Sequence, residues 1–476
     1  MYKKIGDFMD TKISKLNYYT IIFIVLLLPI YFVNYLIKSY FSYTIISFNF
    51  EEILWCLIPL LLFMYVYNLC KKRIKLNILD YLIFIIIFLN FIVCNFAIDM
   101  TTSIWGSYFR GEGLLSFISY YLIFLNCRTL NDTKKINNIL NVFISVGVLQ
   151  SIYCFIQIYF KDLLLPGLTE NLSDNMATGF INNANFMGSY VVLLLGITTT
   201  NFLIQEKKYK KYFILSIIFY INLILGQSTG PFLGFIFMLM FLIIFLIIKN
   251  KLLIKRLLIL ILCLILTYFA IDYTMRQSIS YEDITKEYTI NYDLKQLFRA
   301  ITGKMKLPSN NAESNTLVSD ESNFITNETT NENNSNDIIS DEDNLIYLGS
   351  SRILIWQNSF KLVPKYFWFG CGIDNFGYAY KWHYENIYYD KAHNDYLQIL
   401  VTQGIFVLIT YIIFLITLIK KGIKSNNTLA LTLPLVFSVI GYCIQSFTNI
   451  SVVNVAPYFY MICGLLTSTI IEKTDN

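Results

Sequence analysis

Apolar residues along the chain fall into blocks of roughly 20, the length that a helix needs to cross the ~30 Å hydrocarbon layer of a bilayer. Short polar stretches separate the blocks. A run such as 257–266 does not alternate between apolar and polar positions, as a strand of a membrane barrel would. We therefore expect an all-α integral membrane protein with about twelve transmembrane helices. Their predicted limits are 17–37, 52–70, 79–99, 113–127, 136–160, 184–204, 211–227, 230–248, 252–270, 394–419, 429–448 and 452–471.

The composition also indicates a membrane protein. Only 14% of the residues are charged and 56% are hydrophobic, whereas a soluble domain carries about 25% charged residues. The first apolar block follows four lysines but runs longer than a signal peptide and lacks a small-residue cleavage site, so we expect it to remain as the first span. Of the nine cysteines only Cys371 lies clearly in an outer loop, so no disulfide framework is expected.

Basic residues are divided unevenly between the two sets of loops. One set holds 23 of the 37 Lys and Arg residues, whereas the short loops of the other set hold only Lys38, Arg110 and Lys161. Basic loops of membrane proteins remain in the cytoplasm. We therefore expect both termini in the cytoplasm and the sparsely charged loops outside. The basic set consists of the N-terminus, 71–78, 128–135, 205–211, 249–256, 420–428 and the C-terminal tail.

This topology divides the chain into three regions. Residues 1–270 carry the first nine spans, 271–393 form one large extracytoplasmic loop, and 394–476 carry the last three spans and a cytoplasmic tail. Within the loop, 310–344 contain nine acidic residues and no Lys or Arg, so we expect a disordered acidic insertion. Residues 345–393 are aromatic with interspersed glycines, and we expect them to be structured.

A short interfacial helix is predicted at the start of that structured part. Two serines precede an apolar stripe, lysines flank it, and a proline ends it, which is typical of a helix lying in the membrane interface. Arg352 would lie in its first turn. An arginine there can contact lipid headgroups or a substrate, and this segment alone favours neither. The stripe consists of Ile353, Trp356, Phe360 and Val363, with Pro364 after it.

Both histidines of the chain, His383 and His393, fall in the outer loop. His393 is followed by Asn394 and Asp395 at the start of the tenth predicted span. An imidazole at the membrane surface can act as a general base near neutral pH. A histidine bonded to backbone at a helix start is the alternative, and the segment by itself favours that alternative. Two histidines ten residues apart, without a Cys-rich or helical partner pattern, do not predict a metal site.

Three further polar segments lie on the outer face of the predicted topology. They contain Arg110, the asparagines 182, 183 and 185, and the turn 227–230. Each can be an ordinary loop feature, but the topology places all three on the same surface as His393. Guanidinium groups suit a diphosphate, because they present a fork of donors to phosphate oxygens.

Glycines and aromatic residues mark the rest of the outer loop. The segment 369–377 lacks the spacing of a dinucleotide loop, and we expect a turn in which the backbone closely approaches a ligand or another helix. The aromatic side chains can stack on sugar rings or form an interfacial belt. They are Trp368, Tyr378, Tyr380, Trp382, Tyr388 and Tyr389.

Together these motifs resemble the O-antigen ligase and polysaccharide polymerase family. The likeness is strongest in Gly349-Ser350-Ser351-Arg352-Ile353-Leu354-Ile355-Trp356, Gly370-Cys371-Gly372, Ala392-His393-Asn394-Asp395-Tyr396-Leu397 and Gly404. Arg110-Gly111-Glu112-Gly113-Leu114 and the asparagine-rich 182–185 add to it. The resemblance covers roughly residues 100–470.

The resemblance implies a GT-C-like bacterial glycosyltransferase, inverting, metal-independent and without a cofactor, that acts outside the cytoplasmic membrane in cell-surface polysaccharide assembly. Its donor would be a glycan on undecaprenyl diphosphate and its acceptor a glycan hydroxyl, with membrane lipids around it and no nucleic acid. His393 would deprotonate the hydroxyl, and Arg352 and Arg110 would bind the diphosphate. Substrate-binding positions would be Asn394, Asn185, Asn182 and Gly372. Polymerase and ligase share these motifs.

One position departs from the family pattern, and one other function stays open. The family often has an arginine after the serine that matches Ser228, where this chain has Thr229. Either Arg110 and Arg352 suffice, or another residue such as Arg276 supplies the charge. The alternative function is a flippase or transporter of lipid-linked glycans. Spans nearly free of charged residues disfavour ion-coupled transport, although they do not exclude a glycan flippase.

Overall fold

The computed structural model describes residues 2–41, 48–71, 74–108, 110–160, 176–249, 254–278, 352–383, 389–425 and 429–470. Within these ranges the regular structure is entirely helical. Every one of the twelve predicted spans coincides with a helix. These helices are α1 (Tyr2–Phe41), α2 (Phe50–Cys70), α3 (Ile78–Asn95), α5 (Leu114–Cys127), α6 (Thr133–Tyr159), α8 (Ala184–Ile204), α9 (Tyr209–Leu225), α10 (Thr229–Lys249), α11 (Ile254–Ser278), α16 (Asp395–Lys424), α17 (Leu429–Gln445) and α18 (Ala456–Ile470).

Eight of these helices have the length and apolar composition to cross a bilayer by themselves, among the described residues. They lie in α1, α2, α3, α6, α8, α10, α11 and α16. Helices α5, α17 and α18 are apolar but shorter. The chain is therefore a membrane protein with multiple transmembrane helices, and the count of twelve spans stays a prediction.

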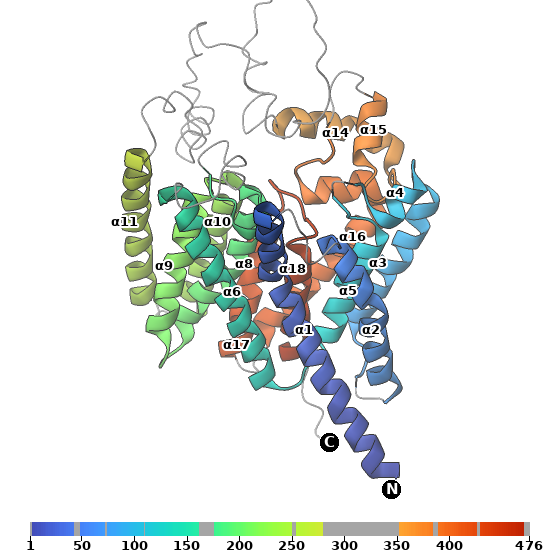
Figure 1. Ribbon diagram of the computed structural model, residues 1–476, viewed down its shortest axis with the longest axis horizontal. Coiled ribbons are helices and arrows are strands. Elements are labelled where there is room, and N and C mark those ends of the chain that lie inside the picture. The colour runs from blue at the N-terminus through green and yellow to red at the C-terminus, as the bar shows by residue number, and fades with distance from the viewer. Residues whose placement is uncertain are drawn as a thin grey trace, which may run out of the picture.

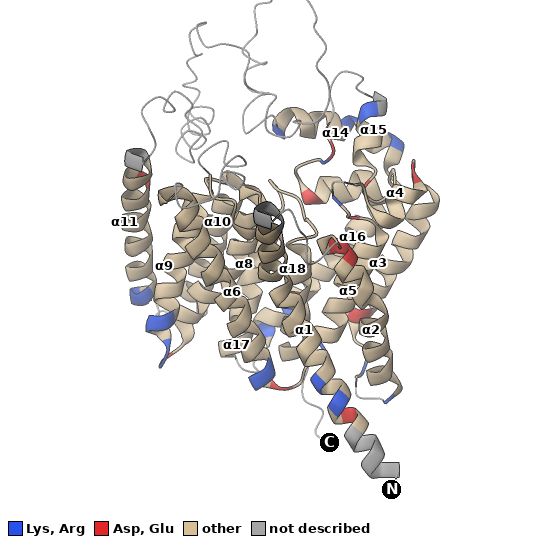
Figure 2. Ribbon diagram, in the orientation of Figure 1, with Lys and Arg blue, Asp and Glu red and all other residues tan. Residues whose placement is uncertain are grey.

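The helices form one bundle with a short-helix layer at one end, which we call the outer end (Figure 1). Helices α14 (Arg352–Tyr366) and α15 (Phe376–His383) lie there, close to α4 (Met100–Trp105). Figure 2 shows basic residues at the opposite ends of α1, α6, α9 and α11. This arrangement agrees with the loop charges, and the cytoplasmic assignment of that end stays a prediction.

Helix α8 occupies the centre of the bundle. Its side chains are buried without a break from Met187 to Leu203, because α9 and α17 pack against it. The approach to α17 is close: a Cβ on Gly196 would lie 2.3 Å from the Cα of Ser438. In lipid the hydrophobic effect does not drive helices together, so small residues stabilise their packing by allowing close van der Waals contact. This packing fixes the position of the outer end of α8, where Asn185 and its polar partners lie.

Helix α14 confirms the short helix predicted from the apolar stripe. It continues through Pro364 to Tyr366 and so ends two residues later than predicted. Tyr366 and Leu362 pack into a second apolar cluster on the outer end of α16, together with Tyr380. Tyr380 is fully buried there, so the expectation that it can stack on a sugar is wrong. The serines before Arg352 and the acidic insertion lie outside the described residues.

The glycine-rich turn that follows α14 docks on a kink in α16. Gly404 has φ 81° and ψ 176°, which interrupts the helix and frees carbonyls one turn earlier. The amides of Cys371 and Gly372 donate to the carbonyls of Val401 and Thr402 at 2.9 and 3.0 Å. Buried carbonyls need such partners. A Cβ on Gly370 would lie 2.2 Å from the Thr402 carbonyl oxygen, so only glycine fits. The prediction of a close approach to another helix is confirmed.

We expect Gly404→Ala to lower the free energy of unfolding by about 1–3 kcal/mol, because the conformation is available almost only to glycine. The new Cβ would also lie 2.3 Å from the carbonyl oxygen of Trp368. Thermal unfolding in detergent measures the effect, with Thr410→Ala in the same helix as the control. Equal unfolding temperatures for the two variants would contradict a strained kink.

Candidate active site

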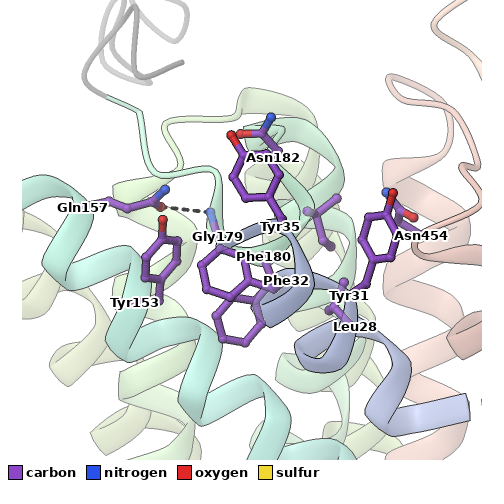
Figure 3. Close-up of a pocket in the computed structure, with 11 residues that line it drawn as sticks. Leu28, Tyr31, Phe32, Tyr35, Tyr153, Gln157, Gly179, Phe180, Asn182 and Asn454 are labelled. Carbon is purple, nitrogen blue, oxygen red and sulfur yellow. Dashed lines mark hydrogen bonds between the residues drawn. The ribbon is translucent and has the colours of Figure 1, made fainter. Parts of the chain in front are cut away.

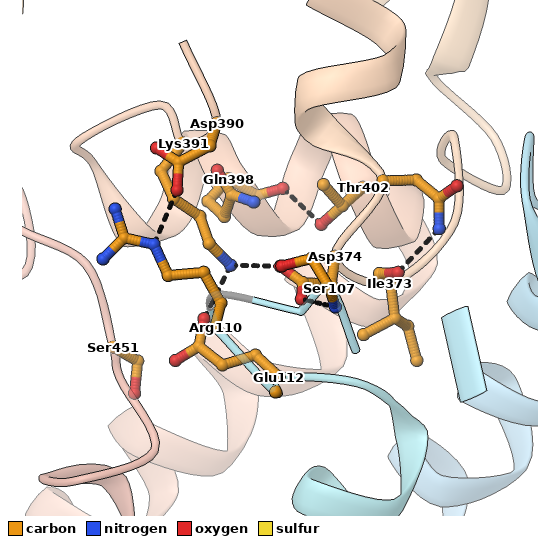
Figure 4. Close-up of polar contacts among 12 residues, drawn as sticks. Ser107, Arg110, Glu112, Ile373, Asp374, Asp390, Lys391, Gln398, Thr402 and Ser451 are labelled. Atoms are coloured by element: carbon orange, nitrogen blue, oxygen red, sulfur yellow. Dashed lines mark hydrogen bonds and ion pairs between the residues drawn. The ribbon is translucent and has the colours of Figure 1, made fainter. Parts of the chain in front are cut away.

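A network of ion pairs joins three outer segments that are distant in the sequence (Figure 4). The Nζ of Lys391 donates to Glu112 Oε2 at 2.6 Å and to Asp374 Oδ1 at 2.7 Å. The second oxygen of Asp374 accepts the amide of Ser107 at 2.6 Å. The segment before α5, the glycine-rich turn and the segment before α16 are thus tied together. We call Lys391, Glu112 and Asp374 the buried triad.

All three side chains of the buried triad are shielded from solvent, with exposures of 4%, 8% and 2%. Burial lowers the pKa of Lys391, but the charges of Asp374 and Glu112 outweigh it and raise the pKa well above its usual range. Burial raises the pKa of Glu112 to about 7, against the opposing effect of Lys391. The ammonium therefore stays charged, and its hydrogen bonds hold Glu112 and Asp374 together.

Arg110 lies beside the buried triad and pairs with Asp390. Its Nε donates to Asp390 Oδ2 at 2.6 Å, in a partly exposed position. Burial raises the pKa of Asp390, but the charge and hydrogen bond of Arg110 outweigh it, so the pKa is lowered. The guanidinium carbon lies 5.8 Å from the ring centroid of Phe186, in the first turn of α8. Arg110 therefore reaches from the pre-α5 segment to the start of α8.

Arg352 contacts the same turn of α8 from a segment that lies much later in the sequence. Its Nη2 lies 3.4 Å from Asn185 Oδ1, which also accepts the hydroxyl of Ser228 at 2.6 Å. The Nδ2 of Asn449 donates to the Asn185 carbonyl at 3.0 Å. Four segments are joined at Asn185, and two arginines flank a helix N-terminus, where amide donors and the helix dipole favour an anion.

His393 lies between the buried triad and α16. Its φ of 47° is left-handed, which is uncommon for a residue other than glycine and is held by the bonds on either side of it. Before it, the Ala392 amide donates to Gln398 Oε1 at 2.8 Å. After it, Asn394 caps α16, with Oδ1 accepting the Leu397 amide at 3.0 Å. The imidazole is therefore presented by a fixed backbone.

The surroundings of His393 keep its imidazole neutral. Burial is the largest cause that lowers its pKa, followed by the charge of Arg352, and the result is about 4. Arg110 and Lys391 act in the same direction, while Asp390 raises the pKa. At neutral pH the ring can therefore accept a proton. In the chain, His393 follows Asp390, the ion-pair partner of Arg110, by three residues.

Comparison with known families connects this geometry to a class of protein. Residues 212–412 match the family model described as O-antigen ligase. This part of the chain is similar to the O-antigen ligase family. This match supports a ligase-like role in polysaccharide assembly and a glycosyltransferase-like activity. No curated protein matches the sequence.

We call Arg110, Asn185, Ser228, Arg352 and His393 the outer cluster. Part of this cluster lies in the matched region and the rest precedes it. Ser228, Arg352 and His393 fall within the match, whereas Arg110 and Asn185 lie on earlier helices and loops. The fold brings these residues together at the start of α8 and the end of the outer loop. Their expected roles in catalysis and substrate binding, including that of Asn394, stay predictions.

Two expected substrate-binding residues lie elsewhere. Asn182 has an exposed side chain and lines a separate cavity beside α1 and α6. Gly372 is packed against Ala97, since a Cβ on it would lie 2.4 Å from that methyl group. The glycine thus has a packing role that needs no substrate, and its contact with substrate stays a prediction.

The family arginine missing at Thr229 has no counterpart in the described part of the cluster. Thr229 is the first residue of α10. The side chain of Arg276 lies outside the described residues, so its expected role stays a prediction. Lys391 is a further cation in the cluster, but it is bonded to two carboxylates. Within the described ranges no group of three or more His, Cys, Asp or Glu could hold a metal ion.

Sequence reasoning missed the buried triad and Asp390. Glu112 and Asp374 were visible as members of glycine-containing segments, and Lys391 lies two residues before His393. Nothing in their spacing predicts that one lysine is buried between two carboxylates from other segments. The sequence feature that could have indicated these acidic partners is an acidic residue within each of two glycine-rich outer turns, Glu112 and Asp374.

Proposed function

We propose that the outer cluster transfers a glycan from an undecaprenyl-diphosphate carrier to a hydroxyl of an acceptor glycan, on the outer face of a bacterial cytoplasmic membrane. One observation carries the proposal: Arg110 and Arg352 flank the first turn of α8, and His393 lies three residues after Asp390, the ion-pair partner of Arg110. Two guanidinium groups at a helix N-terminus suit a diphosphate. A neutral imidazole next to that anion site suits a general base.

The proposed step is a direct displacement at the anomeric carbon. The acceptor hydroxyl gives its proton to His393 while its oxygen forms the new bond to the sugar. The bond from the anomeric carbon to the diphosphate oxygen breaks, and its electron pair leaves on that oxygen. Arg352 and Arg110 would stabilise the developing charge. Attack from the face opposite the leaving group inverts the configuration, and the charge compensation needs no metal.

Proteoliposomes test this function. Purified protein is reconstituted with a lipid-linked glycan donor and a glycan acceptor, and the products are separated by size while the released carrier diphosphate is measured. Longer glycan and released diphosphate, in equal amounts, are expected. Movement of the donor across the bilayer without new glycosidic bonds would overturn the proposal in favour of a flippase.

The pH dependence of the reaction tests the assignment of the base. Arg352→Gln removes a charge that lowers the pKa of His393. The pKa should therefore rise, and the acid limb of kcat/KM should move to higher pH, because only neutral imidazole accepts a proton. We also expect kcat to fall about 10²–10³-fold, as on loss of a donor that stabilises transition-state charge.

Asp390→Asn provides the opposite test, since its carboxylate raises the pKa of His393. The acid limb should then move to lower pH. Rate profiles from about pH 3 to about pH 8, which extend below the pKa of about 4 of His393, are measured for both variants and for wild type. Shifts in the same direction for the two variants would contradict a base at His393.

A further inference from the structure

A cavity of about 210 Å³ opens beside α1 and α6, next to the short helix η2 (Gly179–Ile181) (Figure 3). Five aromatic side chains dominate its lining: Tyr31, Phe32, Tyr35, Tyr153 and Phe180. We call it the aromatic pocket. Its volume is below the roughly 300–1,000 Å³ of pockets for drug-sized ligands, so it suits one small ring.

Three of the aromatic rings pack together and form a wall of the pocket. The centroid of Phe32 lies 4.4 Å from that of Phe180, with the rings stacked, and 4.5 Å from that of Tyr153, with the rings tilted. Ring faces carry partial negative charge. The C–H groups on one face of a pyranose carry partial positive charge, so a sugar ring can lie flat on such a wall while its hydroxyl groups point to the rim.

Amide side chains supply polar groups around this wall. Figure 3 shows the rings between Gln157 on one side and Asn454 on the other. Gln157 is engaged by the fold, since its Oε1 accepts the amides of Thr178 and Gly179 at 3.1 and 3.0 Å. Asn454 Oδ1 is buried and makes no hydrogen bond to any residue in the described ranges.

That acceptor on Asn454 distinguishes two classes of occupant. A buried acceptor without a donor is destabilising. A sugar hydroxyl would supply the donor, whereas the hydrocarbon chain of a lipid would leave the oxygen unsatisfied. The aromatic wall and the amide together therefore favour a carbohydrate.

Two chain segments connect the aromatic pocket with the candidate active site. Asn182 lines the pocket, and three residues later Asn185 contacts Arg352 and Ser228. Asn454 lines the pocket, and the same loop contributes Asn449, which donates to Asn185. A glycan chain reacting at the cluster can thus extend toward the pocket along these segments.

We propose that the aromatic pocket is a carbohydrate subsite that binds one sugar ring of the glycan substrate, away from its reacting end. The inference rests on the proposed function and adds a binding site to it. The ring belongs to the donor glycan or to the acceptor glycan, since both offer the same chemistry. Its occupancy supplies affinity for long glycans and not for the shortest ones.

Asn454→Leu and Tyr153→Leu test the subsite. Both remove a contact to the sugar, and the first also removes the unsatisfied acceptor, so its fold should be retained. The control is Tyr159→Leu on the same helix, α6, whose hydroxyl contacts Thr274 and which does not line the pocket. Unfolding temperatures of all three variants are measured first.

Kinetics in proteoliposomes are then compared for long and short glycans. For the two pocket variants we expect KM for a long glycan to rise about tenfold, the loss of roughly one hydrogen bond or ring contact. With the shortest donor and acceptor, kcat and KM should be unchanged. Varying donor length and acceptor length separately identifies which glycan occupies the pocket. Unchanged KM for long glycans of both kinds in both variants would overturn the inference.

A binding measurement separates this inference from the proposed function. Oligosaccharides released from the native surface polysaccharide are titrated against the purified protein by saturation-transfer NMR, with undecaprenyl phosphate as a sugar-free competitor. Binding lost in Asn454→Leu supports the subsite even if no transfer is detected. Oligosaccharide binding that is unchanged in Asn454→Leu, with binding of undecaprenyl phosphate weakened, would assign the pocket to the lipid and overturn the inference.

Discussion

His393→Ala is expected to lower kcat about 10²–10⁴-fold, the usual contribution of a general base. The reason is that His393 supplies the imidazole of the segment whose Asp390 pairs with Arg110. Donor binding should change little, because Arg110 and Arg352 remain. Transfer of glycan in proteoliposomes and equilibrium binding of the lipid-linked donor are measured on the same preparation.

The matched control is His383→Ala, the only other histidine of the chain. We expect its kcat to equal that of wild type. A loss of donor binding in His393→Ala that accounts for the whole loss of rate would contradict the general-base role and make His393 a binding residue. Equal rates in His393→Ala and wild type would remove the residue from the mechanism.

Lys391→Met is expected to lower the free energy of unfolding by about 3–5 kcal/mol, as when one partner of a buried ion pair is removed. The substitution leaves Glu112 and Asp374 buried, facing each other without the ammonium that joins them. Lys361→Met, on an exposed position of α14, should change the stability by less than about 0.5 kcal/mol. Thermal unfolding in detergent measures both.

The pH dependence of this loss provides a second check. Burial already raises the pKa of Glu112 to about 7, and removal of Lys391 raises it further. A carboxyl whose pKa is higher in the folded state than in the unfolded state destabilises the fold as the pH rises. Lys391→Met should therefore lose more stability at pH 8 than at pH 5.5 (pH values about one unit or more on either side of that pKa). Adding Glu112→Gln should restore part of it, and no restoration would contradict the pairing.

Lys391 is a positioning residue in this view. It joins the pre-α5 segment that carries Arg110 to the segment that carries His393. A variant that folds but loosens this connection should lower kcat without removing the base. This chain has Thr229 where the family often has an arginine. Arg110 and Arg352 are therefore the two described guanidinium groups near Asn185 and Phe186, and binding of the diphosphate would depend on their positions.

Several features of the fold followed from local sequence. Each predicted span coincides with a helix because about 20 apolar residues favour a helix in lipid wherever they occur. The short helix that begins at Arg352 followed from its 3.6-residue periodicity in the same way, and its location in the membrane interface stays a prediction. Loop charges placed Arg110, Arg352 and His393 on one surface, and the structure brings them together at one end of the bundle. Length, periodicity and charge are properties of single segments.

Contacts between distant segments could not be predicted in this way. The loop count treated Arg128 as one more basic residue of an inner loop, yet its side chain is buried in an ion pair with Asp80 of α3. The position of Tyr380 in the sequence predicted an aromatic residue at the membrane interface, but its side chain is buried in an apolar cluster. Burial depends on what packs against a residue, and that is decided by elements far away in the chain.

The sequence by itself determined the helical membrane class, the helix positions, and the outer segments that carry Arg110, Asn185, Arg352 and His393. Only the tertiary structure decided that both arginines meet the first turn of α8 and that the glycine turn docks on the kink at Gly404. It alone placed Lys391 between two carboxylates and Asn182 in a separate aromatic pocket. The physical reason is that the length of an apolar run makes a single segment helical in lipid by itself. A buried charge or a close backbone approach depends on a partner in another segment of the chain.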